Sequence, residues 1–395
     1  MRFAHLADCH LGGWRDQRLR ETNSKAFVMV IDKVLGLNVD FVLIAGDLFN
    51  TSMPPIEALR LAVEQLKRLK DAGIPVYAIA GSHDFSPSGK AMIHVLDAAG
   101  LLHDVFVGEV VDGKLKLAFT VDPKTGVKIA GMIGKKGGLD RVLYDGLIRE
   151  HLESEQGTKI FLFHCALAEI KPKELEDMDA MPVSYLPRGF VYYAGGHVHV
   201  TENVSVGGLK NIVYPGPTYP NNVAELEKLG RGTFVLYDEG TITHVPIEPH
   251  PVVCVSVECS GSSADAERQL REVLSERKVG EAIVTVRVRG KLSAGKSSDI
   301  PFDAITQELY TRGAFAVLRN TSALCSEEFR EVKVAQGTVE DVERELIAGQ
   351  KERRDLVPPL MNALSAQKDE GEKVADFERR VRAEMDVLLG WSGTF

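Results

Sequence analysis

The chain lacks the features that mark membrane proteins, disulfide-rich proteins and basic DNA-binding domains. No apolar run approaches the roughly 20 residues of a membrane helix, and the first residues read as a strand rather than a signal peptide. The five cysteines are scattered without a C-x-x-C pair, which argues against a disulfide framework or a cysteine zinc site. The net charge of −9 gives no bulk signal for nucleic-acid binding, although a metal site or a local basic patch can still meet phosphates. We therefore expect a cytoplasmic protein with no membrane segment.

The order of apolar and polar segments predicts three parts within the 395 residues. Residues 1–249 begin with strands and helices in alternation, continue with short strands between Gly turns, and include a helix over residues 140–155. They predict an α/β fold of two stacked mixed β-sheets flanked by helices. Residues 250–333 read as a small α+β domain, similar to a βαββαβ module, and residues 334–395 as a charged helical tail.

The tail is expected to contain a short helix over residues 339–347, a hinge at Pro358-Pro359 and a last helix with an apolar stripe. Such a stripe usually packs on its own domain. Here the flanking segments are too polar to offer a local core, so docking on a partner is at least as well favoured. The stripe consists of Phe377, Val381, Met385, Leu388 and Leu389.

Five apolar, strand-like runs end in Asp or His. Ligands of α/β sheets bind beyond the carboxyl ends of strands, so these endings are expected to converge on one edge of one sheet. The five segments read HLADCHLG (residues 5–12), VLIAGDLFN (42–50), AIAGSHD (78–84), FLFHC (161–165) and YYAGGHVH (192–199).

The polar endings have the chemistry of a divalent metal site. Asp8 and His10 flank one residue, as do His197 and His199, so each pair projects to one side of an extended chain. Carboxylates and imidazoles are hard-to-intermediate ligands that hold divalent metals. There are more of them than one metal needs, which indicates two metals about 3.5–4 Å apart.

The order D-x-H, G-D-x-x-[ND], G-N-H-[DE], a lone His and G-H-x-H resembles the pattern of the calcineurin-like metallophosphoesterases. The segments HLADCHLG and GDLFN resemble more closely the Mre-eleven type (SbcD-like) DNA double-strand-break repair nucleases. This resemblance implies an αββα sandwich and a manganese-dependent exo/endonuclease that processes DNA ends.

The resemblance also implies roles for single residues. Asp8, His10 and His199 would bind one Mn²⁺, His164 and His197 would bind a second, and Asp47 would bridge the two, with Mg²⁺ as a possible substitute. His83 would protonate or stabilise the leaving oxygen, and Asp84 would orient His83 through a hydrogen bond.

Ser82 departs from the pattern, because it stands where the family has an Asn ligand. Either its hydroxyl reaches the second metal directly, or a water fills the gap and the second site is weaker. We treat Ser82 as a candidate ligand and keep both alternatives.

The resemblance further implies DNA ends as substrate, a homodimer, and a nucleoid-associated complex in which the tail helices bind an SMC-like ABC ATPase of the Rad-fifty type. The domain after His250 would engage or open DNA. Candidate phosphate contacts are Arg15, Arg18 and Arg20, with Lys135 and Lys136; the equal alternative is that these short charge clusters are simply solvated. Two alternatives are a metallophosphoesterase for small phosphodiesters or phosphoproteins, and a scaffold for DNA ends whose site is weakened by Ser82.

Overall fold

The computed structural model describes residues 1–86, 91–135, 137, 139–171, 178–326, 356–368 and 374–389. Contacts divide the chain into two compact units, Met1–Ser326 and Glu327–Phe395. The domain boundaries predicted after residues 249 and 333 stay predictions, and the helix predicted over residues 339–347 lies outside the described residues. Within the described residues, no helix is long and apolar enough to cross a membrane.

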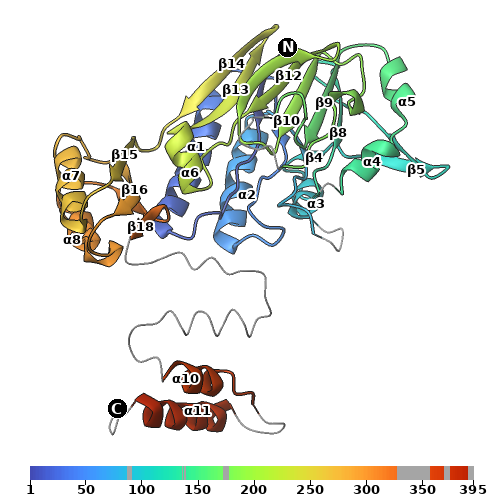
Figure 1. The fold of residues 1–395 in the computed structure, drawn as a ribbon. Coiled ribbons are helices and arrows are strands. Elements are labelled where there is room, and N and C mark those ends of the chain that lie inside the picture. The colour runs from blue at the N-terminus through green and yellow to red at the C-terminus, as the bar shows by residue number, and fades with distance from the viewer. Residues whose placement is uncertain are drawn as a thin grey trace. The chain divides into compact units, whose positions relative to one another are not determined.

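The first sheet contains the strands expected near the N-terminus, in the order β14–β13–β1–β2–β3–β4. Strands β14, β13 and β4 of this sheet are labelled in Figure 1. Strands β1 to β4 are parallel, and β13 is antiparallel to β1 and β14. Helices α1 (Gln17–Gly36), α2 (Ile56–Asp71) and α3 (Met92–Ala98) connect the parallel strands. The strands are β1 (Arg2–Leu6), β2 (Phe41–Ala45), β3 (Val76–Ile79), β4 (His103–Asp104), β13 (Gly232–Asp238) and β14 (Thr241–Ile247).

The second sheet has the order β11–β12–β10–β9–β8–β7. Its four central strands are parallel, and the edge strands β7 and β11 pair antiparallel with their neighbours. A separate hairpin, β5 (Gly108–Val111) with β6 (Lys114–Leu117), precedes it. The strands are β7 (Thr120–Val121), β8 (Lys128–Met132), β9 (Lys159–His164), β10 (Tyr192–Gly196), β11 (Thr201–Val206) and β12 (Leu209–Pro215).

The single helix predicted over residues 140–155 is two short helices, α4 (Arg141–Asp145) and α5 (Arg149–Ser154). The chain between them pairs with strand β6. The amide of Leu115 donates to the carbonyl of Gly146, and the amide of Ile148 donates to the carbonyl of Leu115, both at 2.8 Å. These bonds use backbone groups that a continuous helix would need, and they explain the break.

The two sheets pack face to face with helices on their outer faces. One buried cluster lies between the sheets and joins Phe3, Phe41 and Tyr77 of the first sheet to Leu162 and Tyr192 of the second. Separate buried clusters lie under α1 and α2 on one side and under α4 and α5 on the other. The predicted α/β fold of two stacked, helix-flanked sheets is confirmed.

The segment after residue 250 forms a smaller sheet with its own core. Its helices are α7 (Ser263–Ser275), capped by the Ser262 side chain, and α8 (Phe302–Thr311), and a 3₁₀ turn spans Ser297–Asp299. All strand pairs are parallel, so the module consists of successive βαβ units rather than the predicted βαββαβ order. We call this module the cap; its strands are β15 (Val252–Cys259), β16 (Ile283–Leu292), β17 (Ala316–Asn320) and β18 (Leu324–Ser326).

Among its described residues, the second unit has two helices, α10 (Val357–Leu364) and α11 (Val374–Leu389), which contact each other. The predicted hinge at Pro358-Pro359 is wrong, because both prolines lie in the first turn of α10, where a missing amide costs no helical bond. Ala363 of α10 is buried, so α11 has a helix to pack against. The five residues of its predicted stripe remain half-buried within this unit.

Candidate metal centre

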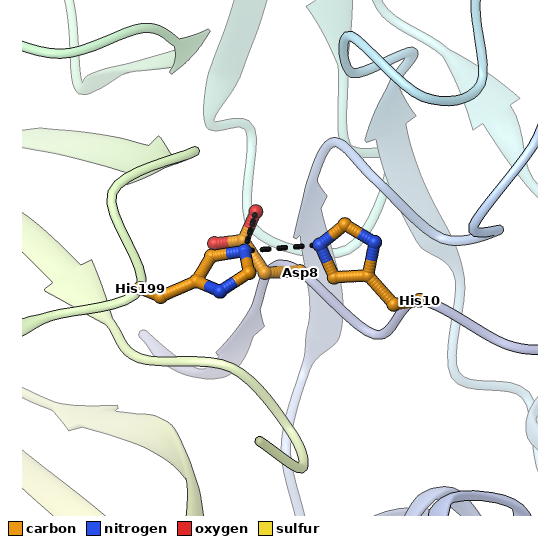
Figure 2. Close-up of side chains that lie close together, drawn as sticks. All are labelled: Asp8, His10 and His199. Carbon is orange, nitrogen blue, oxygen red and sulfur yellow. Dashed lines mark hydrogen bonds and ion pairs between the residues drawn. The ribbon is translucent and has the colours of Figure 1, made fainter. Parts of the chain in front are cut away.

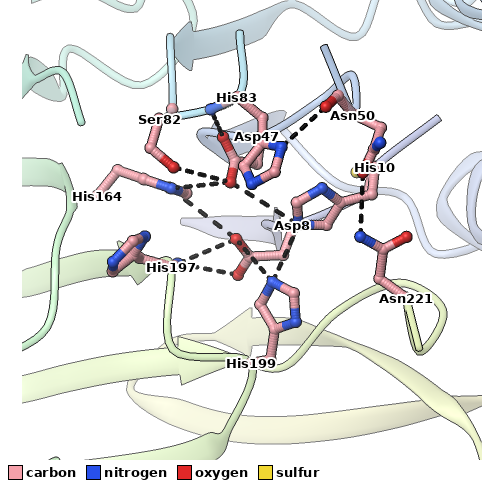
Figure 3. Close-up of polar contacts among 12 residues, drawn as sticks. Asp8, His10, Asp47, Asn50, Ser82, His83, His164, His197, His199 and Asn221 are labelled. Carbon is pink, nitrogen blue, oxygen red and sulfur yellow. Dashed lines mark hydrogen bonds and ion pairs between the residues drawn. The ribbon is translucent and has the colours of Figure 1, made fainter. Parts of the chain in front are cut away.

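The predicted site residues lie together at the carboxyl ends of strands from both sheets (Figure 3). Asp8 follows β1, Asp47 follows β2 and His83 follows β3 in the first sheet. In the second sheet His164 is the last residue of β9, and His197 follows β10. His10 and His199 come from the same two segments as Asp8 and His197. The endings therefore converge as predicted, but the expectation of one edge of one sheet is wrong, because they come from two sheets that pack face to face.

Five of these residues have backbone conformations that most amino acids avoid. The φ angles are 53° for Asp8, 44° for His10, 52° for Asp47, 97° for His197 and 51° for His199. Positive φ in a residue other than glycine costs on the order of 1–3 kcal/mol, and such residues gather at functional sites. The fold holds these side chains in place against that cost.

Two glycines allow the loops to approach the site closely. A Cβ at Gly46, whose φ is 86°, would lie 2.3 Å from Nδ1 of His164. A Cβ at Gly81 would lie 2.2 Å from Oδ1 of Asp47. Both separations are far below van der Waals contact, so glycine is required at these positions.

Asp8, His10 and His199 form the first group of side chains (Figure 2). The Nε2 atoms of His10 and His199 are 2.9 Å apart, and Nε2 of His199 is 3.7 Å from Oδ1 of Asp8. Both oxygens of Asp8 also accept from the amide of His197 at 3.0 Å. Three donor atoms thus converge from three directions on one small volume.

Asp47, His164 and His197 form a second group, and Asp47 also belongs to a third with His10 and His83. Oδ2 of Asp47 lies 3.1 Å from Nε2 of His164 and 3.7 Å from Nε2 of His10. Nε2 of His164 is nonetheless a buried atom without a well-aligned hydrogen bond, while its Nδ1 meets the carbonyl of Ala45 at 2.8 Å. A cation beside Asp47 would satisfy that nitrogen, so the group fits a metal site with Asp47 in the shared position.

Burial changes the pKa of most of these groups. It raises the pKa of Asp8, and it lowers the pKa of His10 to about 3 and that of His197 to about 4. Burial alone would raise the pKa of Asp47 too, but the facing His164 and His10 hold it well below its usual range. Asp47 is therefore an anion, and His10 and His197 are neutral imidazoles.

Two imidazoles keep protons in the metal-free site. Burial opposes the charge on His164, but the Asp47 carboxylate raises its pKa to about 10. Burial opposes the charge on His199 likewise, while Asp8 and Glu225 raise its pKa to about 9. The positive charge of these protonated imidazoles partly neutralises the negative charge of the carboxylates, as a bound cation would.

Ser82 lies beside the carboxylate of Asp47, which two of the side-chain groups share. Its side chain is buried, and its hydroxyl donates to Oδ2 of Asp47 across 3.5 Å. This position is compatible with direct coordination and with a bridging water, so the two alternatives for Ser82 stay open.

His83 is held by backbone groups rather than by Asp84. Nδ1 of His83 donates to the carbonyl of Asn50 at 2.8 Å. Both carboxylate oxygens of Asp84 accept from amides, those of Leu48, Phe49 and Gly81, at 2.8–3.1 Å. The predicted hydrogen bond from Asp84 to His83 is replaced by these contacts, because the buried Asp84 carboxylate is already surrounded by amides. Asp84 supports the loop that carries Asp47.

Three residues of the site were not predicted. Oε1 of Glu225 lies 3.0 Å from Nδ1 of His199, Asn50 accepts from His83, and the side chain of Asn221 donates to Oδ1 of Asn50 at 3.0 Å. Asn50 ends the GDLFN segment, so its position was visible in the sequence. Asn221 and Glu225 follow no strand motif, and only the fold brings them to the site.

A cleft of about 780 Å³ opens over these groups. His10, His83 and His199 line it, together with Asn222 and Lys228. Asp47 and His197 of the second group also line the cleft, so a substrate in it would lie beside the first and the second group.

The predicted DNA-contacting arginines are exposed, but two of them make contacts within the chain. The guanidinium of Arg18 donates to the carbonyl of Phe315 in the cap at 2.8 Å and lies over the ring of Tyr310. Arg20 donates to the carbonyls of Trp14 and Arg15 at 2.9 Å. The ammonium of Lys135 lies over the Phe85 ring, and Lys136 lies outside the described residues. DNA contact stays a prediction for all of them.

Comparison with known proteins gives a family match and several similar relatives. Residues 1–201 match the family model of the calcineurin-like phosphoesterases. The DNA double-strand break repair protein Mre11 of Archaeoglobus fulgidus is 29% identical over 365 residues, which cover 85% of this chain and 77% of that protein. The Mre11 proteins of Methanocaldococcus jannaschii and Methanopyrus kandleri are 30% and 33% identical, over 68% and 58% of this chain and 73% and 51% of theirs.

Proposed function

The chain belongs to the calcineurin-like phosphoesterase family and, within it, to the group of the DNA double-strand break repair proteins Mre11, and from this membership we propose that it is a metal-dependent nuclease acting on the ends of broken DNA. The observation that carries the proposal is the overlap of the three side-chain groups: the third group shares His10 with the first and Asp47 with the second. Overlapping ligand groups suit two metals held close together, the arrangement that phosphodiester hydrolysis uses.

The proposed ligand sets follow the two outer groups. Asp8, His10 and His199 would hold one ion, and His164 and His197 the other. Asp47 would lie between the ions, and Ser82 would serve the second directly or through water. Mixed carboxylate and imidazole ligands suit a divalent metal, and the resemblance to the Mre11 group implies Mn²⁺, with Mg²⁺ as the alternative.

Each side chain then has a defined task in hydrolysis. The two ions, when bound, would polarise the phosphodiester and lower the pKa of a water for in-line attack. His83 lines the cleft, and its Nδ1–H bond to the Asn50 carbonyl fixes the ring and leaves Nε2 to carry the second proton of the imidazolium. We propose that His83 gives this proton to the leaving oxygen.

The remaining parts of the chain would serve the DNA and a partner. The cap would engage DNA. Outside the cap, Arg15 is the candidate for a phosphate contact, because its guanidinium makes no hydrogen bond or ion pair with the described residues. Helices α10 and α11 would bind an SMC-like ABC ATPase through the stripe of α11, and the nuclease would act as a homodimer.

The decisive experiment is cleavage of a linear, end-labelled duplex by the full chain with manganese, with magnesium and with chelator. We expect metal-dependent loss of label that Asp47→Asn abolishes. The matched control is Asp71→Asn, because Asp71 is an exposed carboxylate on α2 that pairs only with Lys67 among the described contacts. Hydrolysis of a small phosphodiester without DNA cleavage would favour the small-substrate enzyme, and metal binding without any hydrolysis would favour the DNA-end scaffold.

A further inference from the structure

Helix α6 (Val223–Leu229) lies between the metal centre and the cap, near β15 in Figure 1. The side chain of Asn222 caps its first turn, and Gly230 ends it in a left-handed conformation. Leu226 is fully buried and anchors the helix in the core under the first sheet. A helix of seven residues has little stability of its own, so its tertiary contacts decide where it lies.

One face of α6 contacts the metal centre through Glu225. Oε1 of Glu225 lies 3.0 Å from Nδ1 of His199. The Glu225 carboxylate is itself fixed, because it accepts from the amide of Asn221 at 2.9 Å and from the side chain of Asn222 at 2.5 Å. An ionised carboxylate only accepts hydrogen bonds, so Nδ1 of His199 carries the hydrogen and Nε2 is the nitrogen that faces Asp8 and His10.

The opposite face of α6 contacts the cap through Glu227. Residues 225 and 227 are about 200° apart around a helix, and their side chains point to different neighbours. Oε2 of Glu227 accepts two bonds from the guanidinium of Arg287 on β16, at 3.0 and 2.5 Å. The backbone carbonyl of Glu227 also lies 3.8 Å from Sγ of Cys254 on β15.

We propose that Glu225 is the positioning residue of His199 and that α6 connects it to the cap through the Glu227–Arg287 ion pair. A carboxylate on the far nitrogen of a ligating histidine fixes the ring and its tautomer, and loss of such a partner weakens metal binding roughly 10–100-fold. The position of the cap on α6 therefore sets how well one metal is held. This inference rests on the proposed function, because it takes His199 as a metal ligand.

The test is titration calorimetry of the full metal-free chain with Mn²⁺. We expect Glu225→Leu to weaken one of the two binding events roughly 10–100-fold and to leave the other unchanged. Glu225→Gln should lose less, because an amide oxygen still accepts from Nδ1 of His199. Arg287→Met, far from the ligands, should weaken the same event roughly 2- to 30-fold.

Arg271→Met is the matched control for the cap. Arg271 pairs with Glu267 and Glu308 inside the cap, so its loss removes two ion pairs without touching α6. A purely structural role for Arg287 would lower the unfolding temperature of the metal-free chain and leave the Mn²⁺ titration like that of Arg271→Met, which would overturn the connection to the cap. Because Arg287 acts through Glu225, the double variant should bind Mn²⁺ no more weakly than Glu225→Leu alone.

Failure of this inference differs from failure of the proposed function. If the unaltered chain binds no Mn²⁺, the ligand assignment itself is wrong. If it binds two ions and Glu225→Leu binds both equally well, the assignment stands and Glu225 does not position His199.

Discussion

The backbone amide of His83 donates a hydrogen bond to Oδ1 of Asp47 at 2.7 Å. The other oxygen of Asp47 faces His10 and His164. The proposed acid is thus attached through its backbone to the carboxylate that would lie between the two metals. The imidazole of His83 can therefore be replaced by another side chain without breaking this backbone hydrogen bond.

His83→Gln should therefore separate chemistry from metal binding. The amide bond to Asp47 survives the substitution, so calorimetry should find Mn²⁺ binding like that of the unaltered chain. Cleavage of an end-labelled duplex should fall about 10²–10⁴-fold, the usual loss when a general acid is removed. His94→Gln is the control, since His94 is exposed on α3. Loss of a bound metal in His83→Gln would show that His83 is a ligand instead.

The two alternatives for Ser82 make different predictions for Ser82→Ala. If the hydroxyl coordinates the second metal, its removal should weaken that binding event by at least the roughly tenfold that a lost supporting group costs. If a water fills the gap, the water remains and the Mn²⁺ affinity should hardly change. Ser82→Asn would supply a longer oxygen-bearing arm and should strengthen the second event in the water-filled case. Calorimetry on both variants decides between the alternatives.

The parts of the fold that were predictable are those whose cause is local. A strand buried on both faces must be an apolar run, so β2 and β3 are visible in the sequence. Parallel strands of one sheet bring their carboxyl ends to the same edge, which is why Asp8, Asp47 and His83 could be predicted to meet. His164 ends a strand of the second sheet, and only the packing of the two sheets brings it to the same place. The left-handed backbone of Asp8 and Asp47 could not be predicted, because no single residue type indicates it.

The missed features depend on contacts between segments far apart in the chain. Glu225 lies in a polar run that reads like any exposed helix, and only the packing of α6 brings it to His199. The break between α4 and α5 comes from pairing with Leu115, about 30 residues earlier. Asp84 occupies the motif position expected of a residue that orients the catalytic histidine. Its buried carboxylate accepts hydrogen bonds from backbone amides instead, and it thereby supports the loop.

The affinity of the site for metal should rise with pH. His164 and His199 have pKa values raised to about 10 and about 9, so both are protonated in the metal-free site at neutral pH. A metal needs the neutral imidazole, and binding must release one proton at each of the two histidines. Each binding event should strengthen by roughly tenfold per pH unit from pH 7 up to the histidine's own pKa.

Calorimetry in buffers of different ionisation enthalpy would count the released protons. An affinity that does not change between pH 7 and pH 9 would contradict the ligand roles of both histidines.

The same pKa values also make the folding stability of the metal-free chain depend on pH. Because the folded-state pKa values lie above the unfolded value near 6.5, the stabilisation by these protons is present below pH 6.5 and is lost as the pH rises through 9 and 10. The metal-free chain should therefore melt at lower temperature at alkaline pH.

The stripe of α11 offers the last prediction. Leu388 is half-buried within the second unit, whereas Val387, its neighbour, is 81% exposed. If the stripe docks on an SMC-like ATPase, Leu388→Asp should abolish co-purification with the co-expressed ATPase, because a carboxylate would be buried without a partner. Cleavage of duplex DNA by the nuclease alone should be unchanged. Val387→Asp adds the same charge beside the stripe and should co-purify normally. If Leu388→Asp still co-purifies, the stripe serves only to pack α11 against α10.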